Sequence, residues 1–192
     1  MRELAILTFM TLDGVVQAPR RGDEDPSDGF RHGGWAAPHW DAVRAHVQRE
    51  AMATPYELLL GCKTYELFAS HFPDEDDDHP MNDATKFVAT TTLSTLGWKN
   101  SIRLAGDVTA EVARLKSQDG LPLQVHSSAH LIQTLFAHDL IDEYRLWTFP
   151  VLVGSGKRLF AGGCVPARLK LVKAETGPTG VTMSIYGRAV SI

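Results

Sequence analysis

The sequence predicts an α/β fold, with helices flanking a mixed, mainly parallel sheet of about eight strands and a β-hairpin at the C-terminal end. Three stretches indicate this class. Residues 4–10 (LAILTFM) form a nearly unbroken apolar run, which is typical of a strand buried on both faces. Residues 121–160 follow the pattern of a strand, a helix and a second strand, as in a βαβ crossover. Residues 169–190 form two strand-like segments around the turn TGPTG.

Turn signals and apolar periodicity define the other elements of the first two thirds. A long polar loop rich in glycine, proline and acidic residues is expected at 15–38, and loops of that length usually cover a functional site or are disordered. A helix is expected from about residue 38, because apolar residues return at helical spacing: Trp40, Val43, Val47 and Ala51. The remaining predictions are strands at 56–60, 86–90 and 101–105, a short helix at 62–68, an acidic loop at 71–80 and a helix from Val108 that Asp119 and Gly120 end.

The last third contains the βαβ unit and the hairpin. A buried strand is expected at 123–126, a helix at 131–140 and the next strand at 144–149. In the final strand, Val181, Met183 and Ile185 alternate with polar residues, which indicates one buried face. A helix that starts where a strand ends presents unpaired N–H groups, so the corner of Ser127, Ser128 and Ala129 is the first candidate for a phosphate site.

Composition bounds the class of protein. The chain has 192 residues, of which 44% are hydrophobic and 22% charged, and this suits a single domain over residues 1–192. A net charge of −4 argues against a general nucleic-acid binder. No apolar run is long enough to span a membrane, and the chain enters its first strand without a leader-like segment, so we expect no membrane association and a cytoplasmic location. Cys62 and Cys164 lack the spacing of a zinc framework.

Three separated motifs carry a family resemblance: TLDGVVQAP at 11–19, LLLGCKTYELF at 58–68 and DEYRLWTFPVLVGSGKRLF at 142–160. Together they make the chain resemble the dihydrofolate reductase-like family that is related to the reductase domain of riboflavin biosynthesis, the RibD C-terminal domain. The resemblance implies a three-layer fold, bound NADPH with NADH not excluded, and reduction of a small pterin-like or pyrimidine-like heterocycle or a carbonyl compound. It also implies a homodimer formed through sheet edges. Two rivals stay open: a nucleotide-binding or regulatory protein without catalysis, and a pterin binder without a nicotinamide.

The resemblance implies that two helix N-termini hold the cofactor. At the first of these, members of the family commonly have an arginine for the phosphate on the adenosine ribose, because its planar fork suits phosphate. This chain has Cys62 there, which leaves Lys63 as the cation, unless Lys63 is only a solvated helix-start residue. Thr64 is expected to bind phosphate or to cap the helix. The other residues of this group are Gly61, Thr90 and Thr91, and the threonines equally suit a plain strand and turn.

The second N-terminus follows the strand at 123–126 and comprises His126, Ser127, Ser128 and Ala129. The family usually has a Gly-Ser pair here, since glycine lets the backbone approach a pyrophosphate closely. Ser127 occupies the glycine position, and a positive φ there would strain the backbone by about 1 kcal/mol or more.

Catalytic and substrate-pocket candidates follow from position. Asp13 comes after the central strand and is a candidate proton donor, unless it only fixes its turn. Asp41 is a second candidate, with stabilisation of a helix N-terminus as the alternative. We expect the aromatic residues Trp35, Trp40 and Tyr65 to stack on a flat substrate, although aromatic residues at helical spacing are more often core. The end of the strand at 144–149 is expected to border the nicotinamide or the substrate through Phe149 and Pro150.

No resident metal is expected. His126 and His130 are spaced i, i+4 but lack the acid of a metalloprotease motif, and we favour an exposed helix start for His130. The acidic run at 74–79 lacks the glycine and terminal glutamate of an EF-hand loop, so it is interpreted as solvated. The PCxxC signature of a zinc deaminase is absent from the sequence.

Overall fold

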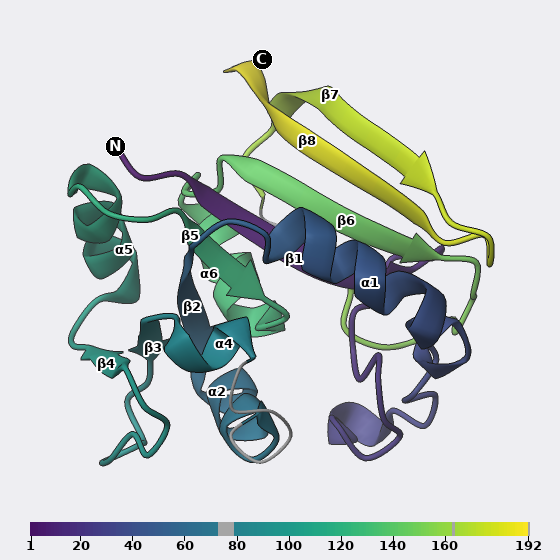
Figure 1. Cartoon of the computed structure of the whole chain (residues 1–192), viewed down its shortest axis with the longest axis horizontal. Coiled ribbons are helices and arrows are strands. Elements are labelled where there is room, and N and C mark those ends of the chain that lie inside the picture. The colour runs from purple at the N-terminus through teal and green to yellow at the C-terminus, as the bar shows by residue number, and fades with distance from the viewer. Residues whose placement is uncertain (73–78, 163, 192) are drawn as a thin grey trace.

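The computed structural model describes residues 1–72, 79–162 and 164–191, and its strands form one eight-stranded sheet (Figure 1). The order across the sheet is β4-β3-β2-β5-β1-β6-β8-β7. All neighbours from β4 to β6 pair in parallel, whereas β8 is antiparallel to both β6 and β7. The predicted mixed, mainly parallel sheet is therefore confirmed. The strands are β1 (Leu4–Thr11), β2 (Glu57–Gly61), β3 (Lys86–Ala89), β4 (Ser101–Leu104), β5 (Leu123–His126), β6 (Glu143–Phe149), β7 (Ala167–Thr176) and β8 (Thr182–Ser191).

Strand β1 lies in the interior of the sheet, as its apolar run predicts. It pairs in parallel with β5 on one side and with β6 on the other. The βαβ unit from β5 to β6 therefore crosses over β1 instead of joining two adjacent strands. Because parallel strands end at the same edge, the ends of β1 and β5 meet, with Leu7 in register with His126.

Helices cover both faces of the sheet and complete three layers. They are α1 (Trp40–Ala51), α2 (Cys62–Ala69), α4 (Pro80–Asp83), α5 (Val108–Ser117) and α6 (Ala129–Ala137). On one face α1 packs through Val43 and Val47 against Leu7 of β1, and Figure 1 shows how α1 crosses that face. On the other face Ile6 packs against residues of α5 and α6. Within the described residues no helix combines the length and apolar character needed to cross a bilayer.

The structure corrects several boundaries. Helix α6 starts and ends earlier than the predicted range of 131–140, because the chain leaves helical geometry after Ala137 and Asp139 has a φ of 57°. The short helix α4 was not predicted; it begins at Pro80, the last residue of the expected acidic loop, and residues 73–78 of that loop lie outside the described residues.

The C-terminal hairpin has the predicted alternation, since Val181, Met183 and Ile185 are buried. Its outer strand β7 is an edge of the sheet and exposes Leu171 and Val172. Pairing of two chains through such an edge stays a prediction.

Candidate functional site

The ends of β1, β2 and β5 open into a trough made of three adjoining cavities. The central cavity, about 700 Å³ in volume, lies between Thr8, the loop at 16–27 and the starts of α2 and α6. The aromatic cavity, of about 450 Å³, shares Phe9 and Ser127 with it and extends toward α1. The α2 cavity, of about 340 Å³, adjoins the central cavity at Lys63, Thr64, Ser128 and Ala129 and extends past Cys62 and Ala89.

The floor of the central cavity is the start of α6. After β5, Ser127 and Ser128 both adopt left-handed backbone conformations, with φ values of 57° and 49°, and the helix begins at Ala129. The positive φ expected at Ser127 is therefore present. The first N–H groups of an α-helix have no partner within the helix, and they carry its positive dipole end. This corner has the features of an anion site, and Ser127, Ser128 and Ala129 all line the cavity.

The start of α2 is bonded directly to the start of α6. The backbone N–H of Gly61 donates to Ser128 Oγ at 3.1 Å, and the backbone N–H of Ser128 donates to Thr64 Oγ1 at 3.1 Å. The structure thus brings together the two helix N-termini that the sequence placed 67 positions apart.

The remaining residues of the first group divide into two sets. Lys63 is exposed, lines both the central and the α2 cavities, and forms no ion pair within the described residues. Cys62 is half-buried, and its Sγ lies 3.5 Å from Thr92 Oγ1 and 3.7 Å from Glu66 Oε2. Thr90 instead accepts a hydrogen bond from the N–H of Thr92 at 3.2 Å, which is turn chemistry. Thr91 is exposed, and neither Thr90 nor Thr91 lines the trough.

The long loop after β1 covers the central cavity and is fixed by Lys157. Lys157 Nζ lies 2.6 Å from Asp25 Oδ2 and 2.7 Å from Ser27 Oγ, and its backbone N–H donates to Gln17 Oε1 at 3.0 Å. Burial opposes the charge on Asp25, yet the bonds from Lys157 and Ser27 bring its pKa below the ordinary value. Sequence reasoning missed these residues, because nothing near position 157 shows that a loop 130 residues earlier folds onto it.

The aromatic cavity has aromatic rings in its wall and is also lined by polar and charged side chains. Trp40 lines it together with Phe9, and the two rings meet edge-on with their centroids 5.5 Å apart. The guanidinium of Arg20 lies 4.6 Å from the Trp40 ring, and Arg44 lines the same cavity. Glu24 is the acid that lines both the aromatic and the central cavities within the described residues, and its Oε2 accepts the N–H of Arg20 at 2.8 Å.

His126 belongs to the aromatic cavity and not to the central one. Its side chain is buried, with Nε2 2.8 Å from Gln124 Oε1 and the ring stacked on Tyr56. Burial, with the nearby charge of Arg145, lowers the pKa of His126 to about 3. The imidazole is therefore neutral at physiological pH. The i, i+4 pair does not form a metal site, since His130 is exposed and His126 is buried.

Three of the predicted pocket aromatics lie in the core. Trp35 is buried and donates from Nε1 to the Gln17 carbonyl at 2.8 Å, and Phe149 packs against it. Tyr65 is buried, and its hydroxyl accepts the N–H of Trp98 at 3.0 Å. Pro150 is exposed beyond the end of β6. None of these residues lines the trough, because the three aromatic side chains face the core and Pro150 lies beyond the end of its strand.

Neither predicted catalytic carboxylate lines the trough. Asp13 accepts hydrogen bonds from the Thr11 hydroxyl at 2.6 Å and from the Gly154 N–H at 2.8 Å. The Thr11 bond, with burial opposing it and the Gly154 bond assisting, lowers the pKa of Asp13, so this side chain stays ionised and fixes two loops. Asp41 is exposed in the first turn of α1, which agrees with its alternative role at a helix N-terminus.

Thr8 places a buried hydroxyl group at the wall of the central cavity. Its side chain is 3% exposed, lines the cavity, and its Oγ1 has no hydrogen-bond partner in the described part of the chain. Buried hydroxyl groups are normally hydrogen-bonded. A polar ligand in the cavity would satisfy Thr8, and the anion site at α6 lies in the same cavity, so these residues fit a phosphorylated nucleotide.

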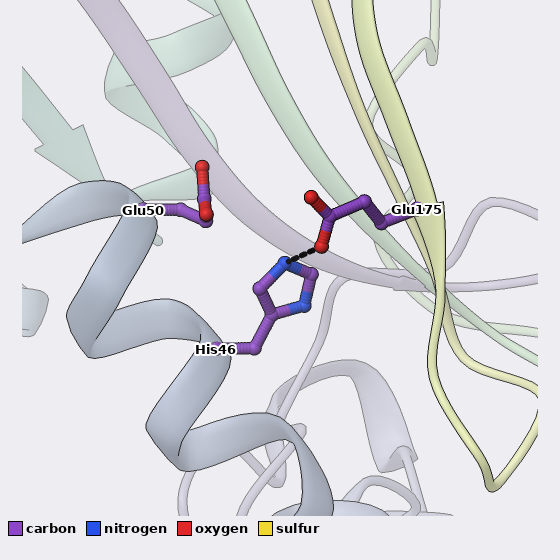
Figure 2. Close-up of side chains that lie close together, drawn as sticks. All are labelled: His46, Glu50 and Glu175. Carbon is purple, nitrogen blue, oxygen red and sulfur yellow. Dashed lines mark ion pairs between the residues drawn. The ribbon is translucent and has the colours of Figure 1, made fainter.

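A separate group of potential metal ligands lies outside the trough. His46 and Glu50, one turn apart on α1, lie close to Glu175 of β7, and Figure 2 shows the ion pair between His46 and Glu175. Lys173 Nζ lies 2.9 Å from Glu50 Oε2 and 2.8 Å from Glu175 Oε1. Hydrogen bonds from Lys173 lower the pKa of both carboxyl groups. Arg49 also pairs with both carboxylates, at 3.2 Å from Glu50 and 3.8 Å from Glu175. Because two cations already balance the two carboxylates, we interpret this group as an ion-pair network that joins α1 to the hairpin.

Comparison with known proteins identifies the family. Residues 2–183 match the RibD C-terminal domain, and the chain belongs to that family. Two Bacillus subtilis (strain 168) proteins named as uncharacterized are similar to it. YyaP is 28% identical over 136 residues, covering 67% of this chain and 72% of YyaP, and YwjB is 29% identical over 159 residues, covering 83% of each. A crystal structure of a candidate riboflavin biosynthesis protein from Shewanella sp. PV-4 has the same fold, with a TM-score of 0.68 at 21% identity over 99% of this chain and 100% of that one.

Proposed function

We propose that this protein is a reductase that binds NADPH along the trough and reduces a small heterocycle or carbonyl compound, pterin-like or pyrimidine-like, in the aromatic cavity. The observation that carries the proposal is the pair of bonded helix N-termini beside a cavity with aromatic walls. Membership of the RibD C-terminal domain family supports a reductase-like function.

The residues of the chain have distinct tasks in this proposal. The first turn of α6 holds the pyrophosphate, and Thr8 bonds a polar group of the nucleotide. Phe9 and Trp40 orient a flat acceptor and exclude water from it. The long loop, held by Lys157, forms one wall of the central cavity.

Bound NADPH would supply a hydride, and reduction then adds that hydride to carbon and a proton to the neighbouring nitrogen or oxygen, leaving NADP⁺. Asp13 and Asp41 do not line the trough, and His126 is neutral. We propose that Glu24 passes a proton from water to the substrate, because Glu24 lines both cavities.

A nucleotide-binding or regulatory role without catalysis is the second candidate. The observation that favours it is the engagement of Asp13 by Thr11 and Gly154, which removes the carboxylate that follows the central strand from the site.

Titration separates these functions. Purified protein is titrated with NADPH and NADH while nicotinamide fluorescence and Tm are followed, and is then mixed with a panel of pterin, pyrimidine and carbonyl acceptors. A reductase binds the nucleotide and oxidises it with at least one acceptor. Binding without oxidation by any acceptor supports the regulatory role, and heterocycle binding alone supports a pterin binder. No nucleotide binding at millimolar concentration contradicts both nucleotide-dependent functions.

A further inference from the structure

The α2 cavity is the one part of the trough to which the proposed function has not yet assigned a part of the dinucleotide. The anion site at α6 takes the pyrophosphate, and the aromatic cavity takes the reacting ring, so the adenosine ribose of a bound dinucleotide extends toward Cys62, Lys63 and Ala89. This assignment rests on the proposed function. It makes the charges of the α2 cavity responsible for distinguishing a 2′-phosphate from a 2′-hydroxyl.

The α2 cavity offers little positive charge for a phosphate. Within the described residues that line it and the central cavity there is no arginine. Of the two lysines, Lys157 is already paired with Asp25 at 2.6 Å, which leaves the exposed Lys63 and the exposed imidazole of His130. Exposed ion pairs contribute little, because water and salt screen them.

The wall beside Lys63 suits a hydroxyl better than a dianion. Cys62 contributes a thiol whose Sγ lies 3.5 Å from the Thr92 hydroxyl and 3.7 Å from the Glu66 carboxylate. A carboxylate so close opposes a phosphate through like-charge repulsion, whereas it accepts a hydrogen bond from a ribose hydroxyl. Glu66 also lines the central cavity, so its charge acts on the same ligand.

We propose that this protein discriminates little between NADPH and NADH, and that Cys62 is the position that sets this weak selectivity. The expected ratio of the two Kd values is below about tenfold. Bidentate guanidinium–phosphate pairs are stronger and more specific than single ammonium contacts. An arginine at position 62 should therefore create selectivity for NADPH where the wild-type chain has little.

The test measures Kd by nicotinamide fluorescence, with displacement by 5′-AMP and by adenosine 2′,5′-bisphosphate as a second readout. It uses the wild type, Cys62→Arg and the uncharged control Cys62→Gln. The wild type is expected to bind NADPH and NADH within about tenfold of each other, and Cys62→Arg to raise the preference for NADPH at least about tenfold with NADH binding kept. Cys62→Gln should not raise that preference, because it adds no charge.

The outcomes are distinct from those that test the proposed function. A wild-type preference for NADPH above tenfold overturns this inference while leaving the reductase proposal intact. An unchanged preference in a Cys62→Arg variant that still binds NADH also overturns it, and if that variant fails to fold, the wild-type ratio decides. Binding of neither nucleotide rejects the proposed function itself.

Discussion

Replacing Ser127 with aspartate is expected to abolish nucleotide binding while leaving the protein folded. The residue lines both the central and the aromatic cavities at the start of α6. Two unit charges 4 Å apart at a protein surface repel by about 4 kcal/mol, so a carboxylate beside the pyrophosphate should weaken binding by at least about 100-fold. Aspartate tolerates the left-handed backbone at φ 57°, and its charge favours a helix N-terminus, so the Tm should be equal to or above that of the wild type.

Ser127→Asn is the matched control for that variant. Asparagine has nearly the same shape and the same tolerance of a positive φ, but no charge. NADPH should bind to Ser127→Asn within about threefold of wild type, a margin well below the charge effect. The measurement is the NADPH-dependent rise in Tm of all three proteins. If NADPH raises the Tm of the aspartate and asparagine variants equally, the pyrophosphate does not bind at the start of α6.

Acid is expected to destabilise the protein through His126. The pKa of this side chain is lowered from 6.5 to about 3 in the folded chain, by burial and by the charge of Arg145. As pH falls, the unfolded chain therefore takes up the proton first. The stability contributed by the neutral imidazole is fully present above pH 6.5 and is lost progressively as pH falls toward 3, at up to about 1.4 kcal/mol per pH unit.

Two variants isolate this effect from the acid titration of carboxylates. His126→Gln should be less stable than wild type near pH 7, because it loses the stacking on Tyr56. Its free energy of unfolding should nevertheless fall less steeply between pH 5.5 and 4, by about 1 kcal/mol per pH unit. His130→Gln removes an exposed histidine and should keep the wild-type slope. Urea unfolding at several pH values gives the free energy of unfolding of the wild type and both variants. If this free energy depends on pH in the same way in His126→Gln and in the wild type, His126 is not a buried, neutral side chain in the folded protein.

The sequence predicted the sheet well because its strongest signals are local. The apolar run of β1 and the alternation in β8 each report burial directly, and both were confirmed. The end of α6 was misplaced, since the left-handed turn at Asp139 is not signalled by a glycine or proline. The two helix N-termini could also be placed, because in a parallel sheet the ends of neighbouring strands meet at one edge.

Other parts of the site depend on contacts that no local pattern reports. Periodicity does not show whether an aromatic residue faces core or cavity, so Tyr65 was predicted in the pocket although it is buried. Phe149 was predicted there from its place at the end of a strand, whereas Phe9, which lines the cavity, was not predicted. The pairing of Lys157 with Asp25 joins loops 132 positions apart and follows only from the assembled fold. Asp13 was a catalytic candidate because it follows the central strand, and its bond to Gly154, 141 positions away, follows only from the assembled fold.

The most direct test of a dinucleotide bound along this trough is an amide chemical-shift titration of isotope-labelled protein with NADPH. We predict that the largest shifts fall on the backbone N–H groups of Ala129, at the start of α6, and of Lys63 and Thr64, at the start of α2. The exposed strand β7 should show none. Shifts confined to residues outside the trough, or none at millimolar NADPH, would contradict the assignment of the two helix N-termini as the phosphate site.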